Sequence, residues 1–225
     1  MNNKIAILIF ANSAEKEIIS KSFSTKSVFE TLNKQTIKIA EKTGLPYFLH
    51  SERQQIGDTF GERITNAIQS IYNKGFNTVI TIGNDTPHLT SAHILKTVDT
   101  LKTHKLVLGP SLDGGFYLMG IKKSCFNTKT FVNLPWQTSK LNRSLNTLVT
   151  ASKKETISYL EPLKDIDEQA DISIVINTKR ELTKTIKKLL VKLILLNKLI
   201  FTDYKTALQT HFCNQHLNKG SPIYA

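Results

Sequence analysis

Two short stretches of the chain place an aspartate beside glycines, a combination that suits a metal or phosphate site. The first reads Ile-Gly-Asn-Asp-Thr-Pro-His-Leu over residues 82–89 and follows an apolar, β-branched run at residues 78–82. The second reads Gly-Pro-Ser-Leu-Asp-Gly-Gly over residues 109–115. If the apolar run is a strand of an open parallel sheet, Asp85 lies at its carboxyl end, where such sheets bind their ligands. A carboxylate at that edge can hold a hard divalent cation.

Each stretch also has an ordinary structural explanation. Asp85 can form a local turn in which its carboxylate accepts hydrogen bonds from nearby amides and Pro87 ends the strand. Asp113 with Gly114 can form a hairpin turn that needs no ligand. The adjacent Gly114 and Gly115 would equally allow a ligand to approach the backbone closely. These residues therefore leave both the functional and the structural explanation open.

Strands and helices alternate along the first half of the chain. Two apolar stripes with helical spacing each begin at a predicted capping box, formed by Ser27 with Glu30 and by Thr59 with Glu62. A third helix is expected over residues 90–103. This alternation predicts an α/β fold, a Rossmann-like three-layer sandwich with a mostly parallel central sheet. The strands are expected at residues 5–10, 47–50, 78–82 and 106–108.

Composition limits the classes of function. A chain of 225 residues with 40% hydrophobic residues is expected to be globular, and its two cysteines provide no disulfide framework. The apolar run near the start is too short for a signal peptide or a membrane span, so a cytoplasmic protein is expected. The net charge of +12 is too diffuse, without a basic-aromatic pattern, to indicate nucleic-acid binding.

The end of the chain differs from the rest. Residues 179–225 hold nine Lys and Arg against two acidic residues, and residues 179–201 predict a basic amphipathic helix. We therefore expect a domain over residues 1–178 and a helical extension over residues 179–225. The helix can pack on the domain, join a second subunit in a homodimer or lie on an anionic membrane surface. A zinc site is a further, weak alternative at His211, Cys213 and His216.

Several of these motifs together resemble the GT-A-type nucleotide-diphospho-sugar transferase superfamily. They are Gln-Ile-Gly-Asp-Thr-Phe-Gly-Glu-Arg at residues 55–63, the aspartate-containing stretches at residues 83–89 and 109–115, Trp-Gln-Thr at residues 136–138, and Asp165-Ile166-Asp167 with Asp171. The closest branch is a bacterial domain of unknown function often labelled a glycosyltransferase of arsenosugar biosynthesis. That branch is kin to molybdenum-cofactor and lactyl-phosphate nucleotidyltransferases. The resemblance covers residues 4–172.

The resemblance implies a GT-A fold in which Asp85 holds Mg²⁺ or Mn²⁺ against the diphosphate of a sugar nucleotide. Asp113 and Asp167 are then the candidate catalytic residues, as a second metal contact or as the base that deprotonates an acceptor hydroxyl. The substrate-binding residues expected around them are Phe10, Ala11, Asn12, Arg63, Gly83, Asn84, Gly114, Gly115, Trp136 and Thr138.

The loop after the first strand departs from the family pattern. Family members carry a lysine, a proline-glycine and a Lys-Thr-Arg-Leu run there, whereas residues 11–17 read Ala-Asn-Ser-Ala-Glu-Lys-Glu. Lys16, Lys21 and Lys26 lie nearby and can substitute for the missing basic residues. We expect a metal-dependent glycosyltransferase that moves a sugar from a nucleotide donor to a small acceptor. The alternatives are a nucleotidyltransferase that uses a nucleoside triphosphate, and an inactive GT-A-fold protein that binds a partner.

Overall fold

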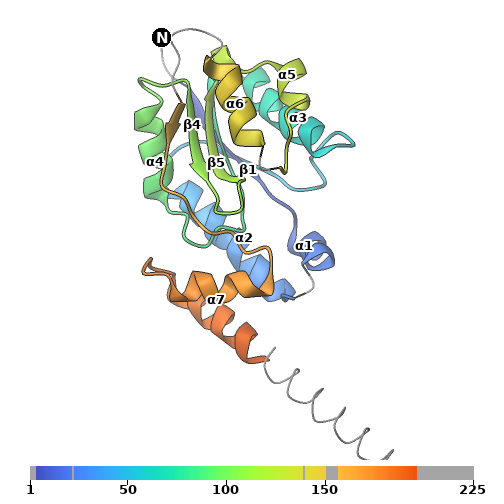
Figure 1. Cartoon of the computed structure of the whole chain (residues 1–225), viewed down its shortest axis with the longest axis vertical. Coiled ribbons are helices and arrows are strands. Elements are labelled where there is room, and N and C mark those ends of the chain that lie inside the picture. The colour runs from blue at the N-terminus through green and yellow to red at the C-terminus, as the bar shows by residue number, and fades with distance from the viewer. Residues whose placement is uncertain (1–3, 22, 139, 151–156, 197–225) are drawn as a thin grey trace, which may run out of the picture.

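A six-stranded sheet lies between two layers of helices in the computed structural model, which describes residues 4–21, 23–138, 140–150 and 157–196 (Figure 1). The strands are β1 (Ile5–Phe10), β2 (Tyr47–His50), β3 (Thr78–Ile82), β4 (Leu106–Pro110), β5 (Phe116–Lys122) and β6 (Ile157–Tyr159). The helices are α1 (Ala14–Ser20), α2 (Lys26–Glu41), α3 (Phe60–Asn73), α4 (Ser91–Thr100), the short 3-10 turn η1 (Lys123–Cys125), α5 (Thr128–Val132), α6 (Leu141–Thr150) and α7 (Gln169–Asn177).

The sheet has the order β2-β1-β3-β5-β4-β6, and β5 runs antiparallel to both of its neighbours. The pairs β1–β2, β1–β3 and β4–β6 are parallel, which confirms the predicted mostly parallel sheet. Because β5 is reversed, its amino end meets the carboxyl ends of β3 and β4, and Leu118 lies opposite both Ile82 and Gly109. The loop of residues 111–115 therefore lies at the same edge of the sheet as Asp85, which follows β3.

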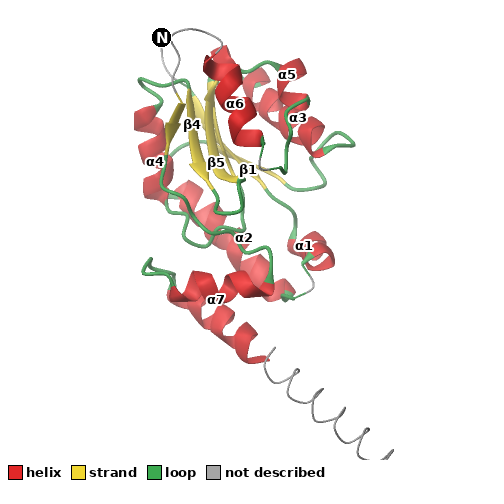
Figure 2. Ribbon diagram, in the orientation of Figure 1, coloured by secondary structure: helices red, strands yellow, loops and turns green. Residues whose placement is uncertain are grey.

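Alternating side chains of the strands fill two separate cores. In β1, Ala6 and Leu8 pack with the side chains of α3, α5 and α6, whereas Ile7 and Ile9 pack with those of α2 and α4. This alternation follows from the two-residue period of a strand, whose successive side chains point to opposite faces. Both faces of the sheet are covered, as Figure 2 shows, so the predicted three-layer sandwich is confirmed.

The two predicted capping boxes had different outcomes. Thr59 caps α3 as expected, since Glu62 N donates to Thr59 Oγ1 at 3.1 Å and Thr59 N donates to Glu62 Oε2 at 2.9 Å. The prediction that Ser27 caps α2 was wrong, because α2 begins at Lys26 and its N-cap is Thr25. Its apolar stripe starts only at Val28, so the exposed first turn carried no periodic signal.

The C-terminal helix packs on the rest of the domain. Residues 184–196 are helical, so the helix starts later than the expected residue 179. Ile186, Leu190 and Leu193 are buried in a third core, together with side chains of α1, α2 and α7. The described part of this helix thus lies against the domain, and the expected boundary at residue 178 stays a prediction.

The opposite face of the C-terminal helix is basic. Lys184, Lys187, Lys188 and Lys192 are exposed there, with Leu195 among them. Contact with a second copy or an anionic membrane stays a prediction, and His211, Cys213 and His216 lie outside the described residues. Among the described residues, every helix is too short or too polar to cross a membrane.

Candidate active site

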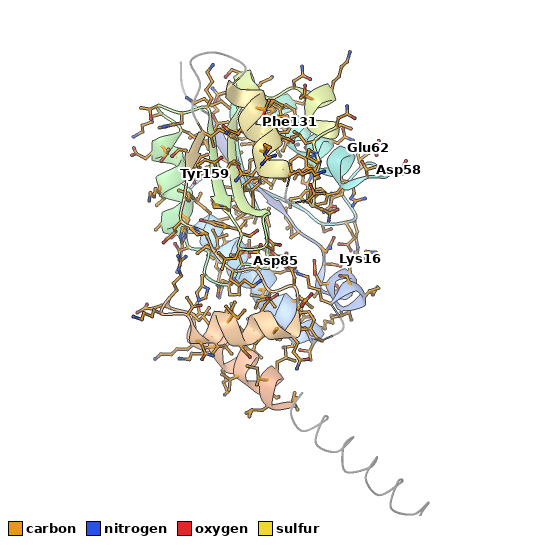
Figure 3. All side chains as sticks on the ribbon, viewed as in Figure 1. Lys16, Asp58, Glu62, Asp85, Phe131 and Tyr159 are labelled. Carbon is orange, nitrogen blue, oxygen red and sulfur yellow. The ribbon has the colours of Figure 1, made fainter. Side chains whose placement is uncertain are left out.

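A cavity of about 580 Å³ opens at the carboxyl edge of the sheet. It is lined by the end of β1, the start of α3, the end of β3, the β4–β5 loop and the segment after β6. Figure 3 shows Asp85 at this edge, beyond the ends of the strands. Every residue that the sequence predicted for the site lines this cavity: Phe10, Ala11, Asn12, Arg63, Gly83, Asn84, Asp85, Asp113, Gly114, Gly115, Trp136, Thr138 and Asp167. Their chemical roles stay predictions.

Three carboxylates converge in the cavity. Asp113, Asp165 and Asp167 each offer an oxygen, and these oxygens all lie within 4.8 Å of one another. Asp165 is buried, whereas Asp113 and Asp167 are exposed to the solvent of the cavity. Negative charges this close repel one another, and a divalent cation between them would offset the repulsion. Three hard oxygen donors fit Mg²⁺ or Mn²⁺, which carboxylates bind in preference to softer metals.

Asp165 is the most perturbed of the three acids. Burial, assisted by the charge of Asp85, raises its pKa to about 7, although the hydroxyl of Thr86 donates to Asp165 Oδ1 at 2.5 Å and opposes the shift. Without a cation, the protonated and the ionised forms of this carboxyl group are therefore both populated near neutral pH. A nearby positive charge would favour the ionised form, because it stabilises the carboxylate.

The glycines of the β4–β5 loop hold Asp113 in a defined position. Asp113 Oδ1 accepts hydrogen bonds from the Ser111 hydroxyl and, at 3.0 Å, from the Gly115 amide. Although burial alone would raise the pKa of Asp113, these two bonds lower it below its ordinary value. Gly114 has a φ of 96°, and a Cβ on Gly115 would lie 3.0 Å from Ser111 Oγ. The glycine pair thus serves the turn that presents an ionised Asp113 to the cavity.

Lys21 provides a positive charge inside the acidic site. Its Nζ lies 2.9 Å from Asp167 Oδ1 and 3.2 Å from Asp85 Oδ2, and it donates to the carbonyl of Ile166 at 2.8 Å. Burial would lower the pKa of Lys21, but the charges of Asp85 and Asp167 raise it above its ordinary value. Asp85, the predicted metal ligand, is paired with this ammonium group and is not one of the three converging carboxylates, so its role as a ligand stays a prediction.

Two asparagines of the cavity are fixed by neighbouring side chains. Asn12 Nδ2 donates to Glu17 Oε1 at 2.9 Å, and Asn84 Nδ2 donates to Asn33 Oδ1 at 2.5 Å. Burial raises the pKa of Glu17, and the charges of Asp85 and Asp167 add to this effect. Asn12 and Asn84 therefore form a polar wall beside the acidic residues.

Another part of the cavity lining is aromatic. Phe60 lies between Phe10 and Trp136, with ring centroids 5.7 and 5.8 Å away, respectively. Trp136 Nε1 donates to the carbonyl of Phe131 at 2.7 Å, so the indole N–H is already used. A Cβ on Gly61 would lie 2.4 Å from the backbone oxygen of Val132 and 2.9 Å from Trp136 Cδ1, so only glycine fits between α5 and the ring. Trp136 can thus offer its ring, rather than its N–H, to a ligand.

Arg63 and Thr138, two further predicted residues of the cavity, form hydrogen bonds with nearby backbone carbonyls. Arg63 Nη1 donates to the carbonyl of Asp58 at 2.9 Å, and Thr138 Oγ1 donates to the carbonyl of Pro135 at 2.7 Å. The carboxylate of the adjacent Glu62 accepts hydrogen bonds in the capping box of α3, and Arg63 does not form an ion pair with it. Arg63 keeps further N–H donors with which it can bind phosphate.

Two members of the site were missing from the predicted residues. Asp165 belongs to the Asp-x-Asp motif that ends at Asp167, and this spacing was a signal that both carboxylates could face one side. Lys21 was considered only with Lys16 and Lys26 as a substitute for the missing basic loop. Its ion pairs with Asp85 and Asp167 had no signal in the sequence, because they join residues 64 and 146 positions apart.

Comparisons with known proteins agree with this geometry. Residues 28–138 match the model of a family described as an uncharacterized protein conserved in bacteria (DUF2064), which confirms over these residues the resemblance to a bacterial domain of unknown function. The label of arsenosugar biosynthesis stays a prediction. No curated protein matches the chain. The fold is similar to that of a provisionally named nucleotide-diphospho-sugar transferase from Desulfovibrio desulfuricans G20, with a TM-score of 0.66, 17% identity, and coverage of 90% of this chain and 98% of that chain. This likeness confirms the predicted GT-A-like fold.

A more distant likeness is found in a second solved structure. It is the 4-diphosphocytidyl-2C-methyl-D-erythritolsynthase from Anaerococcus prevotii DSM 20548, with a TM-score of 0.49 and 12% identity, over 76% of this chain and 93% of that chain.

Proposed function

We propose that the protein is a metal-dependent glycosyltransferase that moves a sugar from a nucleotide-diphospho-sugar donor to a small acceptor. The observation that carries this proposal is the convergence of Asp113, Asp165 and Asp167 within 4.8 Å in a cavity at the carboxyl edge of the sheet. The likeness to a provisionally named nucleotide-diphospho-sugar transferase supports it. We also propose that the protein is cytoplasmic, as expected from the sequence.

The acidic residues give the cavity the chemistry that this transfer needs. A bound Mg²⁺ or Mn²⁺ would supply positive charge to the phosphate oxygens as the nucleoside diphosphate departs. Asp113, Asp165 and Asp167 would hold the cation through their carboxylate oxygens, with Asp85 beside them. Asp113 or Asp167 can also accept the proton of the acceptor hydroxyl, because both are exposed to the cavity. Asp165 is buried and is less suited to that step.

The aromatic wall suits the uncharged parts of the substrates. Trp136 lines the cavity, and it can stack on a sugar or a base because its ring is oriented by the hydrogen bond to the Phe131 carbonyl. The cavity volume of about 580 Å³ lies in the range of sites for ligands of drug size. A donor would then lie with its diphosphate at the carboxylates and its apolar surface near Trp136.

The loop after β1 favours a diphosphate donor over a triphosphate. Ser13 N and Ser13 Oγ both donate to the carboxylate of Glu52 at 2.7 Å, and Ala11 N donates to the carbonyl of His50 at 3.2 Å. These amides are therefore occupied, and Glu52 adds a negative charge beside the loop. A triphosphate needs free amides or positive charge in such a loop. Nucleotidyl transfer remains the second candidate.

Calorimetry with nucleoside diphosphates tests the proposal. At least one of UDP, CDP, GDP and ADP is expected to bind, and to bind about tenfold more tightly or better with Mn²⁺ than with EDTA. Asp85→Asn should weaken this binding. Asp99→Asn is the control, because Asp99 is exposed on α4 and changes the net charge equally.

The possible outcomes separate the candidates. If no nucleoside diphosphate binds with Mn²⁺, or if Asp85→Asn leaves such binding unchanged, the result would contradict the proposed transferase. Absence of all binding would favour an inactive protein that binds a partner. Release of pyrophosphate from a triphosphate in the presence of a phosphorylated acceptor would instead establish the nucleotidyltransferase.

A further inference from the structure

We propose that Lys21 is a built-in counter-cation that competes with the divalent cation for the acidic site. In the metal-free protein, its ammonium group partly neutralises the carboxylates, and the metal must displace it to reach full coordination. This inference rests on the proposed function, because it requires that the carboxylates bind a metal.

The contacts of Lys21 use its full donor capacity. An ammonium group has three N–H donors, and Lys21 Nζ has three oxygen neighbours within 3.2 Å: Asp167 Oδ1, Asp85 Oδ2 and the carbonyl of Ile166. Its side chain is only 14% exposed. The exposed fraction of Lys26, which pairs with Glu15 at the surface, is 49%. Lys21 is thus a buried partner of the acidic site and not a solvated surface charge.

Asp167 connects this ion pair to the converging carboxylates. It contacts Lys21 through Oδ1 and is also one of the three acids whose oxygens meet within 4.8 Å. A divalent cation bound by these acids would therefore lie within a few ångströms of the ammonium group. Like charges at that distance, partly shielded from water, repel strongly. Lys21 already contacts one of the two oxygens of Asp167, and repulsion between the two positive charges would weaken the contact of each with this carboxylate.

The chain around Lys21 allows it to move without unfolding. Lys21 directly follows α1, and its carboxylate contacts are made by a flexible four-carbon side chain. Two of the three carboxylates do not depend on Lys21 for their positions, since Asp113 is held by the β4–β5 loop and Asp165 by Thr86. The backbone of Asp167 is held separately, because Asp167 N donates to Asp171 Oδ2 at 3.0 Å. The ammonium group can therefore leave Asp167 while the metal-binding residues stay in place.

Removal of the ammonium group tests the competition. Lys21→Met is expected to bind Mn²⁺ about tenfold more tightly than the wild type in titrations followed by electron paramagnetic resonance. Lys26→Met is the matched control, because it removes the same charge from a lysine that pairs with surface acids, and its Mn²⁺ affinity should equal that of the wild type. Lys21→Gln serves as a second variant with a polar side chain.

Thermal melting separates competition from a purely structural role. In EDTA, Lys21→Met should melt at a lower temperature than the wild type, because its carboxylates lose their counter-charge. Saturating Mn²⁺ should then raise its melting temperature by more than that of the wild type. A structural role alone would lower both temperatures equally.

The outcomes are distinct from those for the proposed function. Equal or weaker Mn²⁺ binding by both Lys21 variants would overturn the inference and leave the metal site intact. If neither the wild type nor any variant binds Mn²⁺, the proposed function fails and the inference fails with it.

Discussion

Replacement of Asp165 by asparagine is expected to weaken Mn²⁺ binding on the order of 100-fold, the largest loss from a single substitution in the site. Asp165 is the buried member of the three converging carboxylates, at 8% exposure, so its charge is the least screened by water. Asparagine has nearly the same shape, but it provides one neutral oxygen in place of a carboxylate. Calorimetric titration with Mn²⁺ measures the loss, and nucleoside diphosphate binding should weaken in parallel.

The Asp165→Asn variant should remain folded. Its side-chain oxygen can still accept the hydrogen bond from Thr86. Burial raises the pKa of Asp165, so an ionised carboxylate costs stability at neutral pH, and a neutral amide removes that cost. The metal-free variant is therefore expected to be at least as stable as the wild type to urea. Asp99→Asn should change neither the Mn²⁺ affinity nor the stability to urea. An unchanged Mn²⁺ affinity of Asp165→Asn would show that Asp165 is not a metal ligand.

Phe131→Ala is expected to lower the free energy of unfolding by about 3–5 kcal/mol. Phe131 is fully buried in α5, with ring centroids 4.8 Å from Phe126 and 6.4 Å from Trp136. Truncation leaves a cavity beneath α3, α5 and α6, and the neighbouring rings lose contacts that other side chains cannot replace. Urea denaturation followed by circular dichroism measures the effect.

A variant that keeps most of the volume tests the cause of this loss. Phe131→Leu should retain most of the stability, because a large aliphatic side chain refills the space. Because Trp136 packs against Phe131, the alanine variant should also bind nucleotide less well, even at temperatures where it is folded. Equal stability of the alanine and leucine variants would show that packing at this position contributes little.

The sequence predicted the fold and the edge of the sheet that carries the site. The apolar runs of β1 and β3 have the length and composition of covered strands, and the stripe after Thr59 has an unambiguous helical period. Because parallel strands end at one edge, the carboxyl end of β3 alone was enough to place Asp85 there. The other predicted residues that line the cavity, such as Arg63 on α3 and Trp136 after α5, were expected from the family resemblance and not from the strand ends.

The electrostatic details of the site could not be predicted in the same way. The ion pairs of Lys21 depend on how α1 packs against the loop after β3, and this is a tertiary contact without local periodicity. The antiparallel pairing of β4 and β5 agrees with the hairpin turn considered for Asp113 and Gly114, because a loop of five residues is too short to join adjacent parallel strands. The place of β5 between β3 and β4 could not be predicted, because it depends on pairing between strands distant in the sequence. The start of α2 escaped prediction because its first turn is exposed.

A crystal soaked in Mn²⁺ provides the most direct test of the central claim, that carboxylates from separate segments bind one divalent cation. The account predicts an anomalous difference peak within coordination distance of Asp113, Asp165 and Asp167, with the Lys21 ammonium group moved away from Asp167. A fully soaked crystal with no peak in this cavity, or with the peak at surface acids alone, would contradict the account.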